Sequence, residues 1–357
     1  SYFMDFLPYY AAPGSAKYTA TDSASAATAM SCGRKTDAGN IAWATGDPMD
    51  GSLTTIAEYF RDAHHMKVGV ASTVQFSHAT PAAFVSHNVY RNNYAEIATE
   101  ILTMVEPDVV IGGGHPDHSG SYNYVGSQAL FDYLDADSSS TYVFTDWEAS
   151  ADAGTSLDAA AALAVAGHKK LCGVFGAVNG AENFAYPVVT DTPGAPSWSR
   201  NSEDPELAEM IDAAVTVLDS SSTGFFVMFE QGDIDWANHA NHYPNMIGCM
   251  WDLEDTVQAV CDYVDASPTM DWDNTLVIVT SDHSNSYMRL NPMMTLGRGV
   301  LPAVDGSGKP TDGSVAYGSV EHTNELVTIA AKGAAASMFE KYVGIDHPGT
   351  RIVDNTA

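Results

Sequence analysis

Residues 225–239 read FFVMFEQGDIDWANH, an apolar run followed by a polar segment. The apolar run Phe225–Phe229 is short and rich in aromatic residues, which predicts a buried strand. In the polar segment, Asp235 and His239 are four residues apart, so one helical turn would bring both side chains to one face. Ligands of open α/β sheets bind at the carboxyl ends of the strands. We therefore expect an α/β fold with a functional site at this strand end.

The same alternation of short β-rich runs and helical patterns extends along the chain in both directions. Because strand, helix and strand follow one another, the pattern predicts a mostly parallel sheet covered by helices on both faces. The expected strands are Lys67–Ser72, Asp108–Ile111, Phe225–Phe229, Thr275–Thr280 and Leu326–Ala331. The expected helices are Ser23–Cys32, Leu53–Arg61, Tyr94–Val105, Pro205–Leu218 and Ile247–Val264.

Two stretches interrupt this alternation. Residues 119–201 contain an Asp/Ser tract, an Ala-rich run and a Pro-bearing stretch, and residues 286–319 are rich in Gly, Pro and Met. We interpret both as insertions or elaborate loops within a single domain that spans residues 1–357. Residues 112–114 are three glycines after a strand, but the rest of a dinucleotide fingerprint is missing, so a tight turn is expected there.

The composition excludes several classes of partner. The chain has 357 residues and carries 45 Asp and Glu against 15 Lys and Arg, a formal net charge of −30. Such a surface would repel the phosphates of nucleic acids and anionic lipid headgroups. No run of about 18 or more apolar residues occurs, so no membrane span is predicted. The four cysteines form no dense disulfide framework.

A second polar segment, residues 21–29, reads TDSASAATA and begins a predicted helix. Thr21 or Asp22 can cap this helix, which places Ser23 in its first turn. Free backbone N–H groups and the helix dipole favour an anion there, so the Ser23 hydroxyl could attack a phosphate. The alternative is an ordinary capped helix packed through Ala and Ser, and this segment alone favours that alternative.

Three polar clusters supply candidate metal ligands. One is the Asp/His pair of the opening segment, the second is Asp282 with His283 after an apolar run, and the third is the isolated His322. Carboxylate and imidazole groups suit Zn²⁺ or a similar divalent ion, although each His taken alone could be a hydrogen-bonded structural residue. Two sets indicate a two-metal site. They are Asp235, His239 and His322 as one set and Asp282 with His283 as the other.

The segment after the first expected strand adds a candidate for phosphate binding. Residues 75–83 read QFSHATPAA, and Arg91 follows shortly after them. An Arg that points into a site binds phosphate through two N–H groups, and otherwise it pairs with a surface acid. Because the chain has only 15 Lys and Arg residues, an Arg near a candidate site is more informative than usual.

Taken together, these motifs resemble the alkaline phosphatase family. The resemblance is to the bacterial cold-active and marine branch, because Trp236 and His78 stand where the enterobacterial enzyme has Lys and Asp. It implies a three-layer α/β/α sandwich with a mostly parallel central sheet and loop insertions over the active site. The matching segments follow in collinear order over nearly the whole chain, at Thr21–Gly33, Ser77–Tyr94, Glu230–His239, Val279–His283 and Glu321–Val327.

The resemblance also implies an activity, the hydrolysis of phosphate monoesters at alkaline pH through a phosphoserine intermediate. Ser23 would be the nucleophile, Asp22 would orient Arg91, and Arg91 would bind two phosphate oxygens. The cofactors would be two Zn²⁺ and one Mg²⁺. The implied remaining roles are the first zinc for Asp235, His239 and His322, the second zinc for Asp282 and His283, the third metal for Thr80 and Glu230, and the lining of the site for His78 and Trp236.

The resemblance also implies the partners, the oligomeric state and the location of the protein. It implies small phosphate monoesters and inorganic phosphate as partners, a homodimer, and a periplasmic or extracellular location. The metals and Arg91 would supply local positive charge in an otherwise acidic molecule. We hypothesise that the large acidic excess is an adaptation to a salty, marine or halophilic setting, where salt screens self-repulsion.

The sequence departs from the family at its beginning. The family places a metal-bridging Asp after its first strand, within Asp-Gly-Met-Gly, and no matching strand occurs here. Asp5 lies in Phe3-Met4-Asp5-Phe6, which resembles a later part of the family, so that role is not assigned to it. We therefore expect that the sequence is truncated at both ends relative to the working enzyme.

Two other functions fit parts of the pattern. A phosphodiesterase or sulfatase of the same superfamily typically lacks the phosphate-binding Arg and the third metal, so Arg91, Thr80 and Glu230 favour the monoesterase. A non-catalytic phosphate-binding protein would keep the scaffold without turnover. The absent bridging Asp supports that alternative, whereas the intact set of other ligands opposes it.

Overall fold

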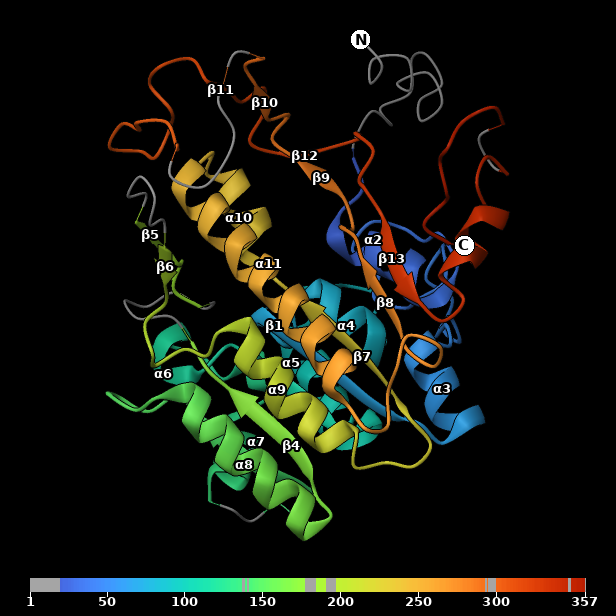
Figure 1. Cartoon of the computed structure of the whole chain (residues 1–357). Coiled ribbons are helices and arrows are strands. Elements are labelled where there is room, and N and C mark those ends of the chain that lie inside the picture. The colour runs from blue at the N-terminus through green and yellow to red at the C-terminus, as the bar shows by residue number, and fades with distance from the viewer. Residues whose placement is uncertain are drawn as a thin grey trace.

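A five-stranded parallel sheet lies at the centre of the molecule, with helices on both faces (Figure 1). The computed structural model describes residues 20–136, 139, 141–176, 184–190, 197–292, 294, 300–345 and 348–356. The strand order is β3-β4-β2-β1-β7. In chain order these strands are β1 (Lys67–Gln75), β2 (Val109–Gly113), β3 (Tyr142–Asp146), β4 (Lys170–Val174) and β7 (Phe225–Glu230).

All five helices expected from the sequence pattern form, with shifted ends in most cases. The segment expected as one helix from Tyr94 to Val105 is an α-helix that continues as a turn of π-helix. The described residues form five further α-helices, which are α4, α6, α7, α8 and α10 in the list that follows. The helices are α2 (Ser23–Cys32), α3 (Ile56–His64), α4 (Ala79–Val85), α5 (Tyr94–Glu100) with the π-helix Ile101–Val105, α6 (Pro116–Ser119), α7 (Gln128–Asp135), α8 (Ala153–Gly167), α9 (Leu207–Leu218), α10 (Asp233–His239) and α11 (Tyr243–Ala266).

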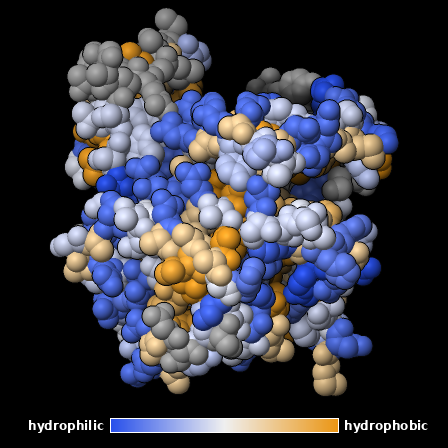
Figure 2. All heavy atoms as spheres, turned by 60° about the horizontal axis from the view of Figure 1, so that its bottom comes forward, coloured by the Kyte–Doolittle hydropathy of each residue, from blue (hydrophilic) through white to orange (hydrophobic). Residues whose placement is uncertain are grey.

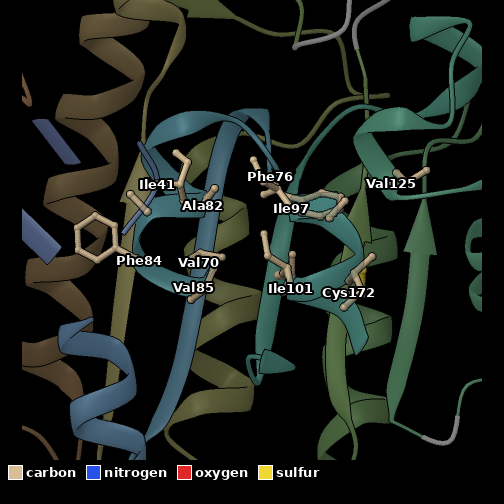
Figure 3. Close-up of a cluster of buried hydrophobic side chains, with 14 of the residues drawn as sticks. Ile41, Val70, Phe76, Ala82, Phe84, Val85, Ile97, Ile101, Val125 and Cys172 are labelled. Atoms are coloured by element: carbon tan, nitrogen blue, oxygen red, sulfur yellow. The ribbon is translucent and has the colours of Figure 1, made fainter. Parts of the chain in front are cut away.

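Two hydrophobic cores lie on the two faces of the sheet, because alternate residues of a strand point to opposite sides. Val70 of β1 and Cys172 of β4 belong to one core, which α2, α4 and α5 cover. Figure 3 shows these two side chains together with Ala82 of α4. Ala71 and Leu171, their neighbours in sequence, belong to the other core, beneath α8 and α9. This arrangement is the three-layer α/β/α sandwich that the sequence predicts.

Most residues of α2 have short side chains, so the helix can pack closely against its neighbours. Its two ends are fixed by the residues that flank it. Asp22 is the N-cap, and its side chain accepts a hydrogen bond from the backbone N–H of Ser25 at 3.1 Å. Gly33 ends the helix with a φ of 64°, a conformation that suits glycine. In between, the Ser31 hydroxyl donates to the carbonyl of Ala83 in α4 at 2.6 Å. The last turn of α2 is thereby held against α4.

The middle of residues 119–201 contradicts the expectation of an insertion. Two of the five central strands, β3 and β4, come from this segment, and α8 packs against α9 on one face of the sheet. Leu171 and Val174 of β4 are fully buried, as are Ala161 and Ala164 of α8. The Ala-rich run is therefore a core helix with small residues at a close contact, so the prediction is wrong for this part of the segment.

The later strands also differ from the expectation. The predicted strand at 275–280 forms as β8 (Leu276–Val279), but it pairs antiparallel with β13 (Ala330–Gly333) instead of lying parallel within the central sheet. The strand predicted at Leu326–Ala331 forms as β13, which begins at Ala330. The chain before β13 is held by a side-chain contact, because Arg289 bonds Glu325 at 2.6 Å.

Three short strand pairs complete the described structure. Their strands are β5 (Val188–Thr190) with β6 (Ser197–Ser199), β9 (Ser284–Asn285) with β12 (His322–Thr323), and β10 (Arg289–Leu290) with β11 (Val315–Ala316). The β10–β11 pair lies within residues 286–319, whose other described parts are turns and irregular chain. A 3₁₀-helix follows β13 at Ala336–Lys341.

The surface is mostly hydrophilic on the face that Figure 2 presents, with apolar patches near its middle. This agrees with the acidic composition of the chain. Within the part of the chain that the structure describes, no helix combines the length and the apolar character needed to cross a membrane.

Candidate active site

The predicted site residues come together where β1, β7 and the first turn of α2 meet. Glu230 is the last residue of β7, and Ser23 is the first residue of α2. Asp282 and His283 follow β8, and His322 lies in β12. Polar side chains from five separate parts of the sequence are thereby gathered at one end of the sheet.

The first predicted metal set forms a compact group. Asp235 and His239 are one helical turn apart in α10, and Asp235 Oδ2 lies 3.3 Å from His239 Nε2. Asp235 Oδ1 lies 3.4 Å from His322 Nε2. Each of the three residues offers a ligand atom, and these atoms lie within 4.8 Å of one another. Among the described residues this is the one group of three His, Cys, Asp or Glu side chains with that geometry.

Backbone carbonyls fix how the two imidazoles of this group are turned. His239 Nδ1 lies 2.5 Å from the carbonyl oxygen of Val320, and His322 Nδ1 lies 2.9 Å from that of Thr21. Because a carbonyl oxygen can only accept, Nδ1–H donates to it in each case, and Nε2 is the ring nitrogen on the side of Asp235 that a cation could reach. A carbonyl partner behind each ring is the arrangement that metal-binding histidines usually have.

The second predicted pair lies directly beside the predicted nucleophile. His283 Nε2 is 2.9 Å from Ser23 Oγ and 3.2 Å from Asp282 Oδ2. The rings of His283 and His322 stack with their centroids 3.5 Å apart, so the two predicted sets adjoin. Ser23 is buried, in the first turn of α2, where the helix dipole favours an anion.

Arg91 is held on two sides. Its Nη1 donates to Asp22 Oδ2 at 3.1 Å, and its Nη2 donates to His78 Nε2 at 3.3 Å. Trp236 contacts the edge of the His78 ring, with the centroids 5.9 Å apart. Burial and the Arg91 charge lower the pKa of His78 to about 3, so its imidazole is neutral and can accept from the guanidinium.

Thr80 and Glu230, the predicted third-metal residues, are also brought together. The Thr80 hydroxyl hydrogen-bonds the Glu230 carboxylate. On the neighbouring strand, the Ser72 hydroxyl donates a short hydrogen bond to Glu230 Oε2. Ser72 and Glu230 are register partners in the β1–β7 pair, which fixes this contact.

Burial and the charges of neighbouring carboxylates raise the pKa values of two acids in the site. Burial, together with the charge of Asp235, raises the pKa of Asp282 to about 7. Burial also raises the pKa of Glu230 to about 7. The hydrogen bonds from Ser72 and Thr80 lower it, and the charge of Asp282 raises it. At Asp235 burial acts in the same direction, but hydrogen bonds to His239 and His322 outweigh it and hold the pKa below its usual range.

The histidines respond to these acids in opposite ways. The hydrogen bond to Asp235 raises the pKa of His239 to about 9. Burial and the charge of His322 lower the pKa of His283 to about 4, so its ring is neutral. A neutral imidazole and clustered, buried carboxylates that repel one another form a donor set that fits divalent cations, which would neutralise the acids.

Two residues of the site were missed in the sequence. Ser72 contacts Glu230, and Asn285 donates from Nδ2 to Asp235 Oδ1 at 2.5 Å. Asn285 is the register partner of His322 in the β9–β12 pair, a pairing of two-residue strands that no sequence pattern reveals. Asp5, which the sequence left without a role, lies outside the described residues.

Comparisons with known proteins identify the family of the chain. The family model described as alkaline phosphatase matches residues 4–123 and 190–307. The alkaline phosphatase of Escherichia fergusonii is 30% identical over 355 residues, a match that covers 89% of this chain and 70% of that protein. The chain therefore belongs to the alkaline phosphatase family.

Solved structures of the family have the same fold. A mutant of the alkaline phosphatase from the Antarctic bacterium TAB5, with Mg bound in its M3 site, superposes with a TM-score of 0.62 at 25% identity and covers 88% of this chain and 77% of its own. The cold-active alkaline phosphatase of a psychrophilic Shewanella superposes with a TM-score of 0.66 at 23% identity, covering 92% and 84%. The second likeness concerns the fold alone.

Proposed function

We propose that the chain hydrolyses phosphate monoesters through a phosphoserine formed on Ser23. The observation that carries this proposal is the position of Ser23, in the first turn of α2 and 2.9 Å from His283 Nε2, beside the group of Asp235, His239 and His322. A hydroxyl at this place faces both an anion-binding helix end and a set of metal-ligand side chains.

The residues present offer three ligands to one divalent metal and two ligands to each of two others, and we propose two Zn²⁺ and one Mg²⁺ at these places. When bound, these ions supply positive charge that activates the serine hydroxyl and neutralises the phosphate. The proposed holders are Asp235, His239 and His322 for the first zinc, Asp282 and His283 for the second zinc, and Thr80 and Glu230 for the magnesium.

The side chains of the chain orient the phosphate for attack. Arg91 binds two phosphate oxygens through its two terminal nitrogens, and Asp22 holds the guanidinium in place. The N–H groups at the start of α2 add further donors. Ser23 Oγ then bonds to phosphorus while the ester oxygen leaves as an alcohol, and water later cleaves the phosphoserine to release inorganic phosphate. Only the phosphate is bound in this scheme, which allows many monoesters as substrates.

The oligomeric state and the location of the enzyme are a separate part of the proposal. Its family membership supports a homodimer and a periplasmic or extracellular location. Light scattering after size exclusion would measure the oligomeric state, and a mass of one chain would contradict the dimer. Recovery of activity in the cytoplasmic fraction of the source cells would contradict the location.

The decisive experiment measures release of a chromogenic alcohol from a phosphate monoester at alkaline pH. We expect activity that a chelator abolishes and that zinc plus magnesium restore. Ser23→Ala should lower kcat by roughly 10³-fold or more, because the phosphoserine can no longer form. Ser222→Ala, which changes an exposed turn residue, is the matched control.

Two results would contradict the proposal. One is a Ser23→Ala variant that keeps most of its activity. The other is faster turnover of a phosphodiester or a sulfate ester than of the monoester, which would place the enzyme among the related diesterases or sulfatases.

A further inference from the structure

A buried polar network adjoins the segment that connects Glu230 to Asp235. Neighbouring residues of a strand point to opposite faces, so β1 and the end of β7 make two side-chain pairs back to back. On the face of the active site, Ser72 bonds Glu230. On the opposite face, the Thr73 hydroxyl donates to Gln231 Oε1 at 3.0 Å.

The Gln231 side chain makes further hydrogen bonds that hold the segment between Glu230 and Asp235. Its Oε1 also accepts the backbone N–H of Asp233 at 3.1 Å, and its Nε2 donates to Asp252 Oδ2 in α11 at 2.6 Å. The backbone N–H of Gly232 donates to the Thr73 hydroxyl at 3.1 Å. A Cβ on Gly232 would approach Val74 Cγ1 to 2.7 Å, so the backbone has little room to shift.

An ion pair lies behind Gln231. Arg200 Nη2 donates to Asp252 Oδ2 at 3.0 Å, and both side chains are only 1% exposed. The other terminal nitrogen of Arg200 donates to the carbonyl of Ala185 at 3.0 Å, and the guanidinium lies over the Phe184 ring. Burying two charges in this way is costly and is often no more stable than apolar packing, so stability alone does not account for the pair.

We propose that Arg200 and Asp252 are positioning residues for the metal ligands. The pair holds Gln231, and Gln231 holds the backbone from Glu230 to the start of α10, which carries Asp235. This inference rests on the proposed function, in which Glu230 and Asp235 bind metals. Neither member of the pair touches the reacting atoms, so the pair acts only by fixing where the two carboxylates stand.

A swap of the two polar groups tests this inference. Gln231→Glu places a second carboxylate against Asp252, and Asp252→Asn leaves Arg200 without its anion. The double variant Q231E/D252N restores one amide and one carboxylate, with the hydrogen bond reversed. Zn²⁺ affinity is measured on the folded, metal-free protein by competition with a fluorescent zinc chelator. We expect about a 10- to 100-fold loss in each single variant and recovery to within about threefold in the double variant.

The chain offers a matched control on the same helix. Gln258 is exposed and donates to Asp262 Oδ1 at 2.7 Å, the same chemical contact outside the network. Gln258→Glu should bind Zn²⁺ like the unchanged protein. If Gln231→Glu does not fold, as judged by circular dichroism, Gln231→Met gives the same comparison without an added charge.

The outcomes separate the inference from the proposed function. If the folded Gln231 variants bind Zn²⁺ as tightly as the unchanged protein, or if the double variant is no better than the singles, the positioning role is wrong. If Asp235→Asn and Glu230→Gln both leave Zn²⁺ and Mg²⁺ binding unchanged, the proposed ligand assignment itself is wrong.

Discussion

At the scale of single residues, Arg91 shows how the site depends on shape as well as charge. Its two terminal nitrogens are held by Asp22 and His78, so the guanidinium plane has a fixed direction. The pKa of Asp22 is lowered because hydrogen bonds from Ser25 and the charge of Arg91 outweigh the effect of burial. A charged Asp22 keeps Arg91 in place even when no phosphate is bound.

Replacing Arg91 by Lys tests this dependence. Arg91→Lys keeps the charge but loses the planar fork, so the inhibition constant of inorganic phosphate should rise about tenfold, with a similar rise in KM. Steady-state inhibition measured with a chromogenic monoester provides both constants. Arg61→Lys, the same change in α3, is the control and should leave both constants as they are. An unchanged inhibition constant in Arg91→Lys would show that Arg91 does not bind the phosphate.

At the scale of elements, α3 is stabilised by its first turn. The Thr55 hydroxyl accepts from the backbone N–H of Glu58 at 3.1 Å, and the Glu58 carboxylate accepts from the backbone N–H of Thr55 at 3.0 Å. This capping box satisfies two N–H groups that the helix itself leaves free.

Removing the cap should therefore lower stability without changing the chemistry. Thr55→Ala should reduce the free energy of unfolding by about 1 kcal/mol, measured by urea denaturation, with kcat unchanged. Thr54→Ala, at the exposed neighbouring position, is the control. Equal unfolding midpoints for the two variants would contradict a role for the cap.

His87 joins α3 to α5 through two acids. Its Nδ1 lies 2.9 Å from Glu100 Oε1 and its Nε2 lies 3.3 Å from Glu58 Oε2. Burial disfavours the charged ring, but the hydrogen bonds and charges of the two acids outweigh it and raise the pKa of His87 to about 9. The folded state therefore binds the proton more tightly than the unfolded chain, whose His pKa is about 6.5.

This contact makes stability depend on pH. The contribution of His87, roughly 3 kcal/mol, is fully present below about pH 6.5 and is lost as the pH rises through about 9. Urea denaturation at pH 6, 7.5 and 9 should show a fall in stability that is smaller in His87→Gln, where only other groups such as His239 still contribute to it. His64→Gln, an exposed histidine of α3, should keep the fall. Parallel profiles for His87→Gln and the unchanged protein would contradict this prediction.

The elements also show what could be predicted from the sequence. The Asp235–His239 pair on α10 was predicted from a local pattern, a spacing of one helical turn that follows the apolar run Phe225–Phe229, whereas the roles of Ser23 and Glu230 came from the family resemblance. The strands β3 and β4 were missed because their segments look like loops until the buried side chains of Leu171 and Val174 are seen. Antiparallel β8 and β13 depend on a pairing between distant segments, which local periodicity does not encode.

At the scale of the whole molecule, the net charge of −30 acts on every part of the fold. Like charges on a compact surface repel one another, and added salt screens that repulsion over a Debye length of about 10 Å at 0.1 M. The repulsion is larger in the compact state than in the expanded unfolded chain, so screening should favour folding.

We accordingly expect the melting temperature to rise by several degrees as NaCl increases from low to molar concentration. Calorimetry or fluorescence at about 0.01, 0.1, 0.5 and 2 M NaCl gives the curve. A rise that levels off near 0.5 M indicates simple screening, and a rise that continues to 2 M supports adaptation to a salty setting. A melting temperature that stays constant or falls would contradict both.

The contacts that complete the site join residues that are far apart in the sequence. The site can therefore form only after the later of these residues have been synthesised. The Ser23 contact with His283 spans 260 positions, and the carbonyl of Thr21 that turns the His322 ring lies 301 positions from it. A chain emerging from the ribosome therefore carries Ser23 early but lacks the partners of that serine until those later residues have been made, about 15 to 60 s later at about 5–20 residues per second. A chain cut short before His322 cannot form the three-residue group of Asp235, His239 and His322.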